Sequence, residues 1–396
     1  MSEKMVGAHD GVGSRGALRT AASRLLSTTD IWSDAPSPPP APPVLPPAPQ
    51  PDPIAQAPVT AEIVTTTAPV APAQLPAGQW PPRKLSLALQ GGGTFAAFTW
   101  GVLERLLEEP IEIDAISGAS AGAINALLLA SGLAEGGREA ARARLGRFWL
   151  RLMHEASFRS LMLVGGFSPA GSSVAFGPTL RSGQFDPFDL DPLRQALTRD
   201  IDFAALLTPG CPKLLIAATR IRDGQQQIFR NDAITADVAL ASTCPPLVHC
   251  AVEIEGEAYW DGGFGGNPPL LRLAQETTTS DVLLVQVTPA RDTYVPITLA
   301  AIDRRLDQIA ANAALNAEIA AIAWAQAHAA PSLRLTRIAA EDSVDGLAQR
   351  SSTDLGHGFI RLLHRSGRAA AERWLGQDAA GTEAPSVLSA AEPALL

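Results

Sequence analysis

The chain is poor in cysteine and in charge and lacks a long apolar run, and each scarcity narrows what it can be. Its three cysteines, Cys211, Cys244 and Cys250, have neither paired nor metal-like spacing, so we expect free thiols in a reducing compartment and no zinc. A charged fraction of 18% with a net charge of -9 argues against a nucleic-acid partner. Neither a secretory apolar core nor a span of about 20 apolar residues is found. The sequence therefore predicts a soluble cytoplasmic protein, either free or peripheral to a membrane or lipid granule.

Proline and alanine are concentrated near the N-terminus and divide the chain. Residues 35–82 are dominated by Pro, Ala, Val, Thr and Gln, which predicts an extended linker with polyproline II character. Residues 1–34 are predicted to be disordered, although their basic stretch 14–26 also fits a short peripheral membrane anchor. The 46% hydrophobic content can supply the core of one catalytic domain, predicted at 83–377, followed by a disordered tail at 378–396.

The most informative motif is a G-x-S-x-G pentapeptide formed by Gly118, Ser120 and Gly122. A short apolar strand precedes it and a helix of small residues follows it. This context is typical of a nucleophile elbow, in which a strained turn presents a serine and the flanking glycines let strand and helix pass closely. The alternative is a glycine-rich turn at a helix start. The pattern predicts Ser120 as a nucleophile.

Upstream, a second strand-like run leads into three glycines. Residues 85–90 are largely apolar, Gly91, Gly92 and Gly93 follow, and residues 94–108 have a helical pattern. Backbone N–H groups at such a helix start suit an anion, either a phosphate or the oxyanion of ester hydrolysis. A phosphate loop would require Lys with Ser or Thr, or G-x-G-x-x-G with a later acid, and neither is present.

Downstream, an apparent hairpin ends in Asp261, Gly262 and Gly263. Apolar Val252 and Ile254 lie on its first arm, and Glu-Gly-Glu forms its turn. A lone Asp-Gly-Gly is most often only a turn. A carboxylate at the end of a strand can also serve as a general base.

In this order, the three motifs resemble the patatin-like phospholipase family over about residues 83–377. The resemblance implies a patatin-like three-layer α/β/α fold with a mostly parallel central sheet, and a Ser-Asp dyad without histidine, metal or cofactor. It implies Ser120 as the nucleophile and Asp261 as its base. It also implies an oxyanion hole formed by the N–H groups of Gly92 and Gly93, with Ala121 as a further donor.

The chain departs from the family pattern just after the glycines. The family has G-G-G-x-x-G with a basic residue or histidine before the last glycine, whereas this chain has Thr94, Phe95 and Ala96. Alanine fits if position 96 has helical dihedral angles and fails if a positive φ is required. A catalytically weak or silent protein that binds a lipid surface or granule is therefore an alternative function.

A conventional hydrolase triad would need a histidine late in the chain. None of the candidates has a convincing catalytic setting: one lies within an apolar run, one on an alanine-rich helix and one between glycines, so most are expected to be structural or surface residues. The candidates are His249, His328, His357 and His364.

The remaining pattern alternates strands with helices and supports an α/β fold. Strands are predicted at 213–218 and 282–287 and helices at 138–154 and 297–330. Within the last helix, apolar residues recur at helical spacing, at Ile302, Leu306, Ile309 and Ala313.

Residues 158–188 are predicted to form a long loop, rich in Gly, Ser, Pro and bulky apolar side chains. Such loops are often lids, so we expect substrate contacts here, although packing on the core explains the residues equally well. The expected contacts are Leu161, Met162, Phe167 and Phe176.

Together these features predict a serine-dependent hydrolase of lipid carboxylic esters, with a lipid or other acyl ester as its partner. A serine thioesterase or peptidase is the second alternative function, because the shape of the pocket decides the substrate.

Overall fold

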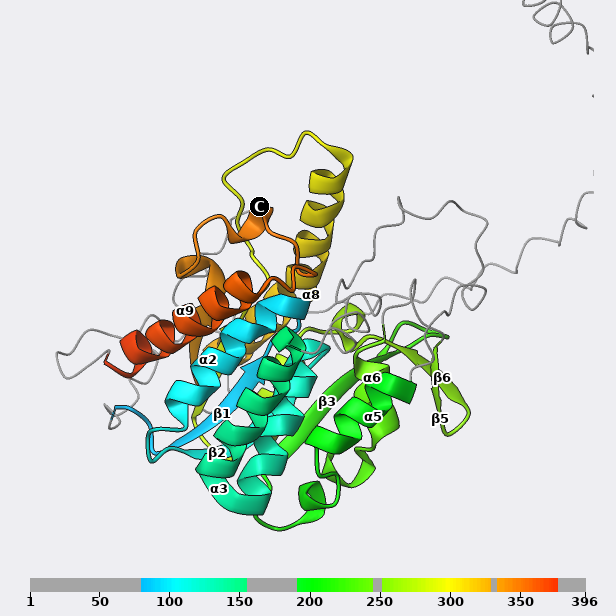
Figure 1. Cartoon of the computed structure of the whole chain (residues 1–396), viewed down its shortest axis with the longest axis vertical. Coiled ribbons are helices and arrows are strands. Elements are labelled where there is room, and N and C mark those ends of the chain that lie inside the picture. The colour runs from blue at the N-terminus through cyan, green and yellow to red at the C-terminus, as the bar shows by residue number, and fades with distance from the viewer. Residues whose placement is uncertain (1–79, 155–190, 245–250, 329–332, 377–396) are drawn as a thin grey trace, which may run out of the picture. The chain divides into compact units, whose positions relative to one another are not determined.

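The computed structural model describes residues 80–154, 191–244, 251–328 and 333–376 (Figure 1). The N-terminal segment, most of the predicted linker, the predicted lid at 158–188 and the tail lie outside the described residues. The same holds for His249, for Cys250 and for the expected substrate contacts Leu161, Met162, Phe167 and Phe176. The domain boundaries at 83 and 377 remain predictions.

One eight-stranded sheet forms the centre of the domain, in the order β5-β6-β3-β2-β1-β7-β8, with β4 paired to β3. The five strands β1, β2, β3, β7 and β8 pair in parallel, and β4, β5 and β6 add antiparallel pairs at one side. The predicted mostly parallel sheet is confirmed. The strands are β1 Lys84–Leu89, β2 Glu112–Gly118, β3 Lys213–Arg220, β4 Gln226–Phe229, β5 Val252–Ile254, β6 Glu257–Trp260, β7 Asp281–Gln286 and β8 Arg334–Ala339.

Helices cover both faces of this sheet (Figure 1). Helices α2, α3, α5, α6 and α9 share one apolar cluster with the sheet, whereas α7 and α8 share another, which makes three α/β/α layers. Within the described residues no helix is both long and apolar enough to cross a membrane. The α-helices are α2 Ala96–Leu106, α3 Ala121–His154, α5 Asp191–Asp200, α6 Ala236–Ser242, α7 Leu270–Glu276, α8 Leu299–His328 and α9 His357–Leu375. The 3₁₀ helices are η1 Gly93–Phe95, η2 Ala205–Leu207, η3 Asn231–Ala233, η4 Gly262–Phe264, η5 Ala340–Asp342 and η6 Leu347–Gln349.

The alternation of side chains along β1 explains how the sheet builds two cores. Leu85, Leu87 and Leu89 belong to the cluster under α2, α3 and α9, whereas Ala88 belongs to the cluster under α7 and α8. Successive side chains of a strand point to opposite faces. A strand that is apolar at both its odd and its even positions is therefore buried on both sides. The apolar run read from the sequence therefore indicates a central strand.

Most predicted elements are confirmed, with shifts at their ends. The predicted helix at 94–108 begins as the 3₁₀ turn η1 before α2, and the helix predicted at 138–154 is the second part of α3, after a break at Gly136 and Gly137. The helix predicted at 297–330 is α8. Its apolar stripe is not buried, however: Ile302, Leu306 and Ile309 are exposed, and Leu315 and Ile322 face the core instead. The packed side of α8 carries polar residues near the glycine loop formed by Gly91, Gly92 and Gly93, so apolar spacing alone identifies the wrong face.

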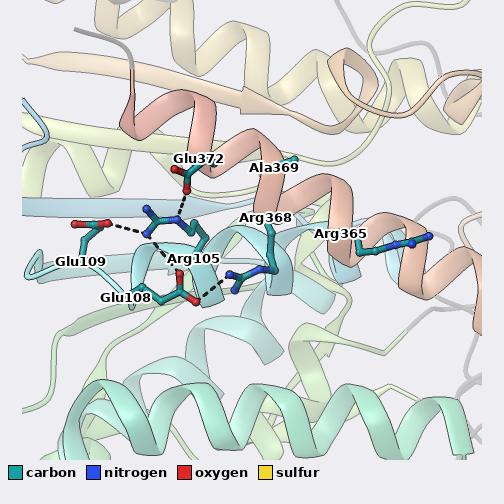
Figure 2. A pocket seen from close by; sticks show the side chains of 7 residues that line it. All are labelled: Arg105, Glu108, Glu109, Arg365, Arg368, Ala369 and Glu372. Atoms are coloured by element: carbon teal, nitrogen blue, oxygen red, sulfur yellow. Dashed lines mark hydrogen bonds and ion pairs between the residues drawn. The ribbon is translucent and has the colours of Figure 1, made fainter. Parts of the chain in front are cut away.

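Two cavities of the described residues lie away from the carboxyl ends of the parallel strands. One, of about 620 Å³, is an open notch between the end of α2 and α9 (Figure 2). The other, of about 520 Å³, is lined by α7, α8 and residues 277–280, which precede β7. Because α2 begins at Ala96, just after the glycines and η1, and its 11 residues rise about 1.5 Å each, its last residue is about 16 Å from its start.

Paired charges line the notch. Arg105 Nη1 lies 2.8 Å from Glu109 Oε1 and its Nε bonds to Glu372, and Arg368 Nη2 lies 2.9 Å from Glu108 Oε1 (Figure 2). Such exposed or half-exposed pairs contribute little each. We interpret this cluster as a contact that joins α2 to α9, not as a ligand site.

Candidate active site

Three chain segments that the sequence singled out meet at one edge of the sheet. The glycine loop follows β1, Ser120 follows β2, and Asp261 follows β6. The carboxyl ends of parallel strands are where open α/β sheets bind their ligands. The three motifs therefore occupy the edge at which a site is expected.

The turn at Ser120 has the geometry of a nucleophile elbow. Ser120 adopts a φ of 53°, a left-handed conformation that is strained for a residue with a side chain. A Cβ added to Gly122 would lie 2.2 Å from the Leu89 carbonyl oxygen, and one on Gly118 would lie 2.8 Å from the Gly122 carbonyl oxygen. Strand and helix therefore pass as closely as the motif predicted. The N–H of Ser120 donates to Ser242 O at 3.1 Å, which holds the strained residue on α6.

Ser120 and Asp261, 141 residues apart in sequence, are in direct contact. The Ser120 hydroxyl donates to Asp261 Oδ2 at 2.8 Å, and Asp261 Oδ1 accepts a hydrogen bond of 2.7 Å from the Gly263 N–H. Both side chains are buried, with 3% exposure. The Thr219 hydroxyl, on β3, donates to the Asp261 carbonyl oxygen at 2.8 Å. Each carboxylate oxygen thus has one donor, and Ser120 supplies one of the two.

Burial gives this carboxyl the character of a base. Desolvation raises the pKa of Asp261 from 3.8 to about 6, although the hydrogen bonds from the Gly263 N–H and from Ser120 act in the opposite direction. A pKa near the working pH is favourable for general-base catalysis. Asp261 is therefore ionised at neutral pH and yet more basic than an exposed aspartate.

Three backbone donors near Ser120 are not engaged. Within the described residues, the N–H groups of Gly92, Gly93 and Ala121 donate no hydrogen bond. Ala121 begins α3 and Gly93 begins η1, so both lie at helix starts, where unsatisfied N–H groups favour negative charge. These are the three groups that the sequence predicted as oxyanion donors.

The altered end of the glycine loop has ordinary geometry. Ala96 has a φ of -66°, so alanine meets no backbone strain there, whereas Gly93 has a φ of 56° and uses the freedom of glycine. The Phe95 ring is buried and packs edge-on against Phe359 of α9, with 6.1 Å between ring centroids. The residue that replaces the family's polar side chain is thus part of the core.

Polar side chains behind the loop were missed by the sequence analysis. Asn267 bonds to both the N–H and the carbonyl oxygen of Gly91, and Gln90 accepts hydrogen bonds from the N–H groups of Val287 and Thr288. These residues have no motif of their own, because Asn267 lies in a Gly-Gly-Asn-Pro run that reads as a turn.

The described histidines have partners outside the dyad. His364 lies on α9, stacks on Trp100 and has its Nε2 2.5 Å from Glu104 Oε2. His328 is close to the end of α8, where its Nδ1 lies 2.7 Å from the Trp324 carbonyl oxygen. His357 is the first residue of α9 and packs its ring against His154. Among the described residues no cluster of three or more His, Cys, Asp or Glu side chains is arranged to hold a metal ion.

Comparison with known families agrees with the motifs. Residues 87–274 match the family described as patatin-like phospholipase, a range that contains the glycine loop, Ser120 and Asp261. The chain carries a patatin-like phospholipase domain. The family that this domain matches is described as one of phospholipases. No curated protein gives a significant match.

Solved structures similar to this patatin-like domain are remote. VipD from Legionella pneumophila has 13% identity and a TM-score of 0.39, and the match covers 75% of this chain and 67% of that one. The type III effector ExoU has 17% identity and a TM-score of 0.31, with 75% and 53% covered. ExoU in its heterodimeric complex with SpcU, from Pseudomonas aeruginosa, has 15% identity and a TM-score of 0.30, with 75% and 52% covered. The chain thus spans about half the length of ExoU.

Proposed function

We propose that the protein hydrolyses lipid carboxylic esters through an acyl-Ser120 intermediate, with Asp261 as the general base. The observation that carries the proposal is the 2.8 Å hydrogen bond from a strained, buried serine to a buried carboxylate of raised pKa. A serine hydroxyl is a poor nucleophile until a base within hydrogen-bond reach removes its proton.

The proposed reaction has two balanced steps. Ser120 Oγ attacks the ester carbonyl carbon and gives its proton to Asp261, while the carbonyl oxygen becomes an oxyanion that accepts from Gly92, Gly93 and Ala121 N–H groups. Collapse expels the alcohol, which takes the proton from Asp261, and leaves acyl-Ser120. Water then attacks the acyl carbon with Asp261 again as base, and the fatty acid leaves with the serine restored.

The silent-protein alternative has less support. This alternative rests on the presence of Phe95 and Ala96 where the family has other residues. Ala96 has helical dihedral angles, however, and the proposed donors, the N–H groups of Gly92 and Gly93, lie earlier in the loop. The thioesterase or peptidase alternative would use the same dyad. It differs only in the leaving group, so substrate comparison is needed.

Labelling with a fluorophosphonate tests the proposal. We expect one covalent adduct in the intact mass of the native chain and none in Ser120→Ala, because phosphonylation requires an activated serine. Hydrolysis of matched oxyester, thioester and amide substrates with one acyl chain should then favour the oxyester. If the folded native protein is not labelled, either with or without lipid vesicles, the proposal is wrong. The catalytically silent lipid-binding protein then becomes the favoured function.

Exposed apolar side chains support action at a lipid surface. Val295, Ile297 and Leu299 are 85%, 91% and 70% exposed, in the loop before α8 and at its start. Asn312 of α8 bonds to Gln90 beside the glycine loop, so at about 1.5 Å per residue Leu299 lies about 20 Å further along the helix. Figure 1 shows this end of α8 extending beyond the sheet. Exposed apolar patches of this kind mark interaction sites.

The double variant Ile297→Asp with Leu299→Asp should bind zwitterionic vesicles at least about tenfold more weakly, because each buried aliphatic side chain contributes about 1.5 to 3 kcal/mol. Hydrolysis of a short water-soluble ester should be unchanged. Leu207→Asp is the matched control, since Leu207 is 63% exposed but lies before β3, at the opposite edge. Equal sedimentation of the native protein and the double variant with vesicles would contradict binding to a lipid surface. If the native protein is instead a dimer and the double variant a monomer, the exposed apolar side chains would be a contact between two copies of the chain.

A further inference from the structure

We propose that Asn267 is a positioning residue that aims the Gly92 N–H at the oxyanion. This rests on the proposed function and deepens it, because it says what holds the oxyanion hole in shape. Asn267 itself contacts neither Ser120 nor Asp261 through a hydrogen bond; it acts through Gly91.

Asn267 bonds to both backbone polar groups of one residue, Gly91, and thereby to two successive peptide units. Its Oδ1 accepts from the Gly91 N–H at 2.6 Å, and its Nδ2 donates to the Gly91 carbonyl oxygen at 3.1 Å. Asn267 is fully buried. Among the described residues, the polar atoms of its side chain bond to Gly91 alone. A buried carboxamide with both groups committed to one glycine fixes that glycine from two directions.

Peptide planarity turns this contact into control over the proposed donor. The Gly91 carbonyl and the Gly92 N–H belong to the same planar peptide, so fixing the direction of the carbonyl fixes the N–H, which points the opposite way. The Thr288 hydroxyl also donates to the Gly91 carbonyl oxygen, at 3.2 Å. Asn267 and Thr288 therefore both donate to the carbonyl oxygen of the Gly91–Gly92 peptide. The N–H of the same peptide, on Gly92, is the proposed oxyanion donor.

The fit around Gly91 leaves little freedom for this plane to move. A Cβ on Gly91 would lie 2.6 Å from Ser120 Cβ and 2.6 Å from the Ala119 carbonyl oxygen. The loop thus touches the elbow on one side and Asn267 on the other. Asn267 follows Asp261 by six residues, so one turn carries both the base and the side chain that orients the donor.

Asn267→Ala should lower kcat for p-nitrophenyl butyrate about 100-fold and leave KM within about threefold, because a displaced donor affects the transition state more than the bound ester. Affinity for a trifluoromethyl ketone, which forms an oxyanion on Ser120, should fall about as much as kcat. Affinity for butyrate, the product, should not. The pH midpoint should stay near 6, since the contacts of Asp261 remain.

Thr288→Val is the conservative companion, because it keeps the shape and removes one of the two donors to Gly91. It should lower kcat about tenfold with unchanged thermal stability, and it decides the question if Asn267→Ala does not fold. Asn231→Ala is the matched control: Asn231 bonds to the backbone of Leu206, Pro212 and Leu214 at the opposite edge. It should lose stability but keep kcat.

Each outcome separates the inference from the function. A native protein that hydrolyses through Ser120, with Asn267→Ala and Thr288→Val at native kcat, overturns the positioning role and leaves the function intact. A parallel fall of ketone and butyrate affinity would show a general loss of structure and also overturn it. A native protein without Ser120-dependent turnover overturns both proposals.

Discussion

Replacing Asp261 with Asn is expected to lower kcat about 10⁴-fold and, at the same time, to stabilise the folded protein at pH 8. The loss of activity follows from losing the base that accepts the Ser120 proton, and its size is typical of neutralising the acid of a serine hydrolase site. The gain in stability follows from burial. An asparagine can keep both contacts, accepting from the Gly263 N–H and donating to Ser120 Oγ, without burying a charge.

The sign of the stability change follows from the direction of the pKa shift. The pKa of Asp261 is raised from 3.8 to about 6 by desolvation, so the folded state holds the proton more tightly than the unfolded chain does. Its stabilising contribution is complete below about pH 3.8 and is lost as the pH rises through about 6. At pH 8 the buried carboxylate therefore costs about 3 kcal/mol relative to an unshifted group, on the order of two pKa units.

Thermal unfolding of native protein and Asp261→Asn at pH 8 and pH 5 measures this difference. The variant should be more stable by about 2 kcal/mol at pH 8, and the difference should be smaller at pH 5 because part of the Asp261 population is then protonated only in the folded state. In the native protein the rate of fluorophosphonate labelling should fall about tenfold per pH unit below 6, and residual labelling of the variant should not depend on pH.

Asp200→Asn is the control for removing a buried carboxylate. Asp200 is 8% exposed and pairs with Arg151, so the same substitution removes the negative charge of a buried ion pair and should destabilise the protein. It should not change kcat. A destabilised Asp261→Asn at pH 8, or one that retains kcat, would contradict the assignment of Asp261 as a desolvated base.

The parts of the site that the sequence predicted are those with local steric requirements. Ser120 needs a strand before it, a helix after it and glycine at positions 118 and 122, and all of these lie within one short segment. The hairpin before Asp261 is similar, because its two turn residues, Glu255 and Gly256, both adopt positive φ. Such constraints can be read from neighbouring residues.

The parts that the sequence did not reveal depend on contacts between distant segments. Asn267 meets Gly91 across 176 residues, and nothing near Asn267 distinguishes it from a turn residue. The raised pKa of Asp261 comes from burial, which only the assembled fold supplies. The exposed stripe of α8 has the same origin: on the buried side of this helix Asn312 accepts hydrogen bonds from Gln90 and Gln286, so polar residues replace the apolar ones that spacing predicts.

Gly122→Ala should be the most destabilising small substitution in the elbow, lowering the free energy of unfolding by about 3 kcal/mol or more. The added methyl carbon would lie 2.2 Å from the Leu89 carbonyl oxygen, which is backbone of β1 and cannot rotate away. The strand would have to shift, and the glycine loop that follows β1 would shift with it. Remaining folded protein should therefore also lose most of its labelling by the fluorophosphonate.

Gly146→Ala is the matched control, because Gly146 lies in the same helix, α3, and a Cβ there meets nothing within 4 Å. Alanine is the better helix former, so this variant should be about 0.5 to 1 kcal/mol more stable than native protein. Urea unfolding of the three proteins measures both effects. Opposite signs for one chemical change in one helix would establish that close approach to β1, and not helix propensity, requires glycine at position 122. Equal stability of both variants would mean that β1 and α3 are further apart at the elbow. The geometry described for the turn at Ser120 would then be wrong.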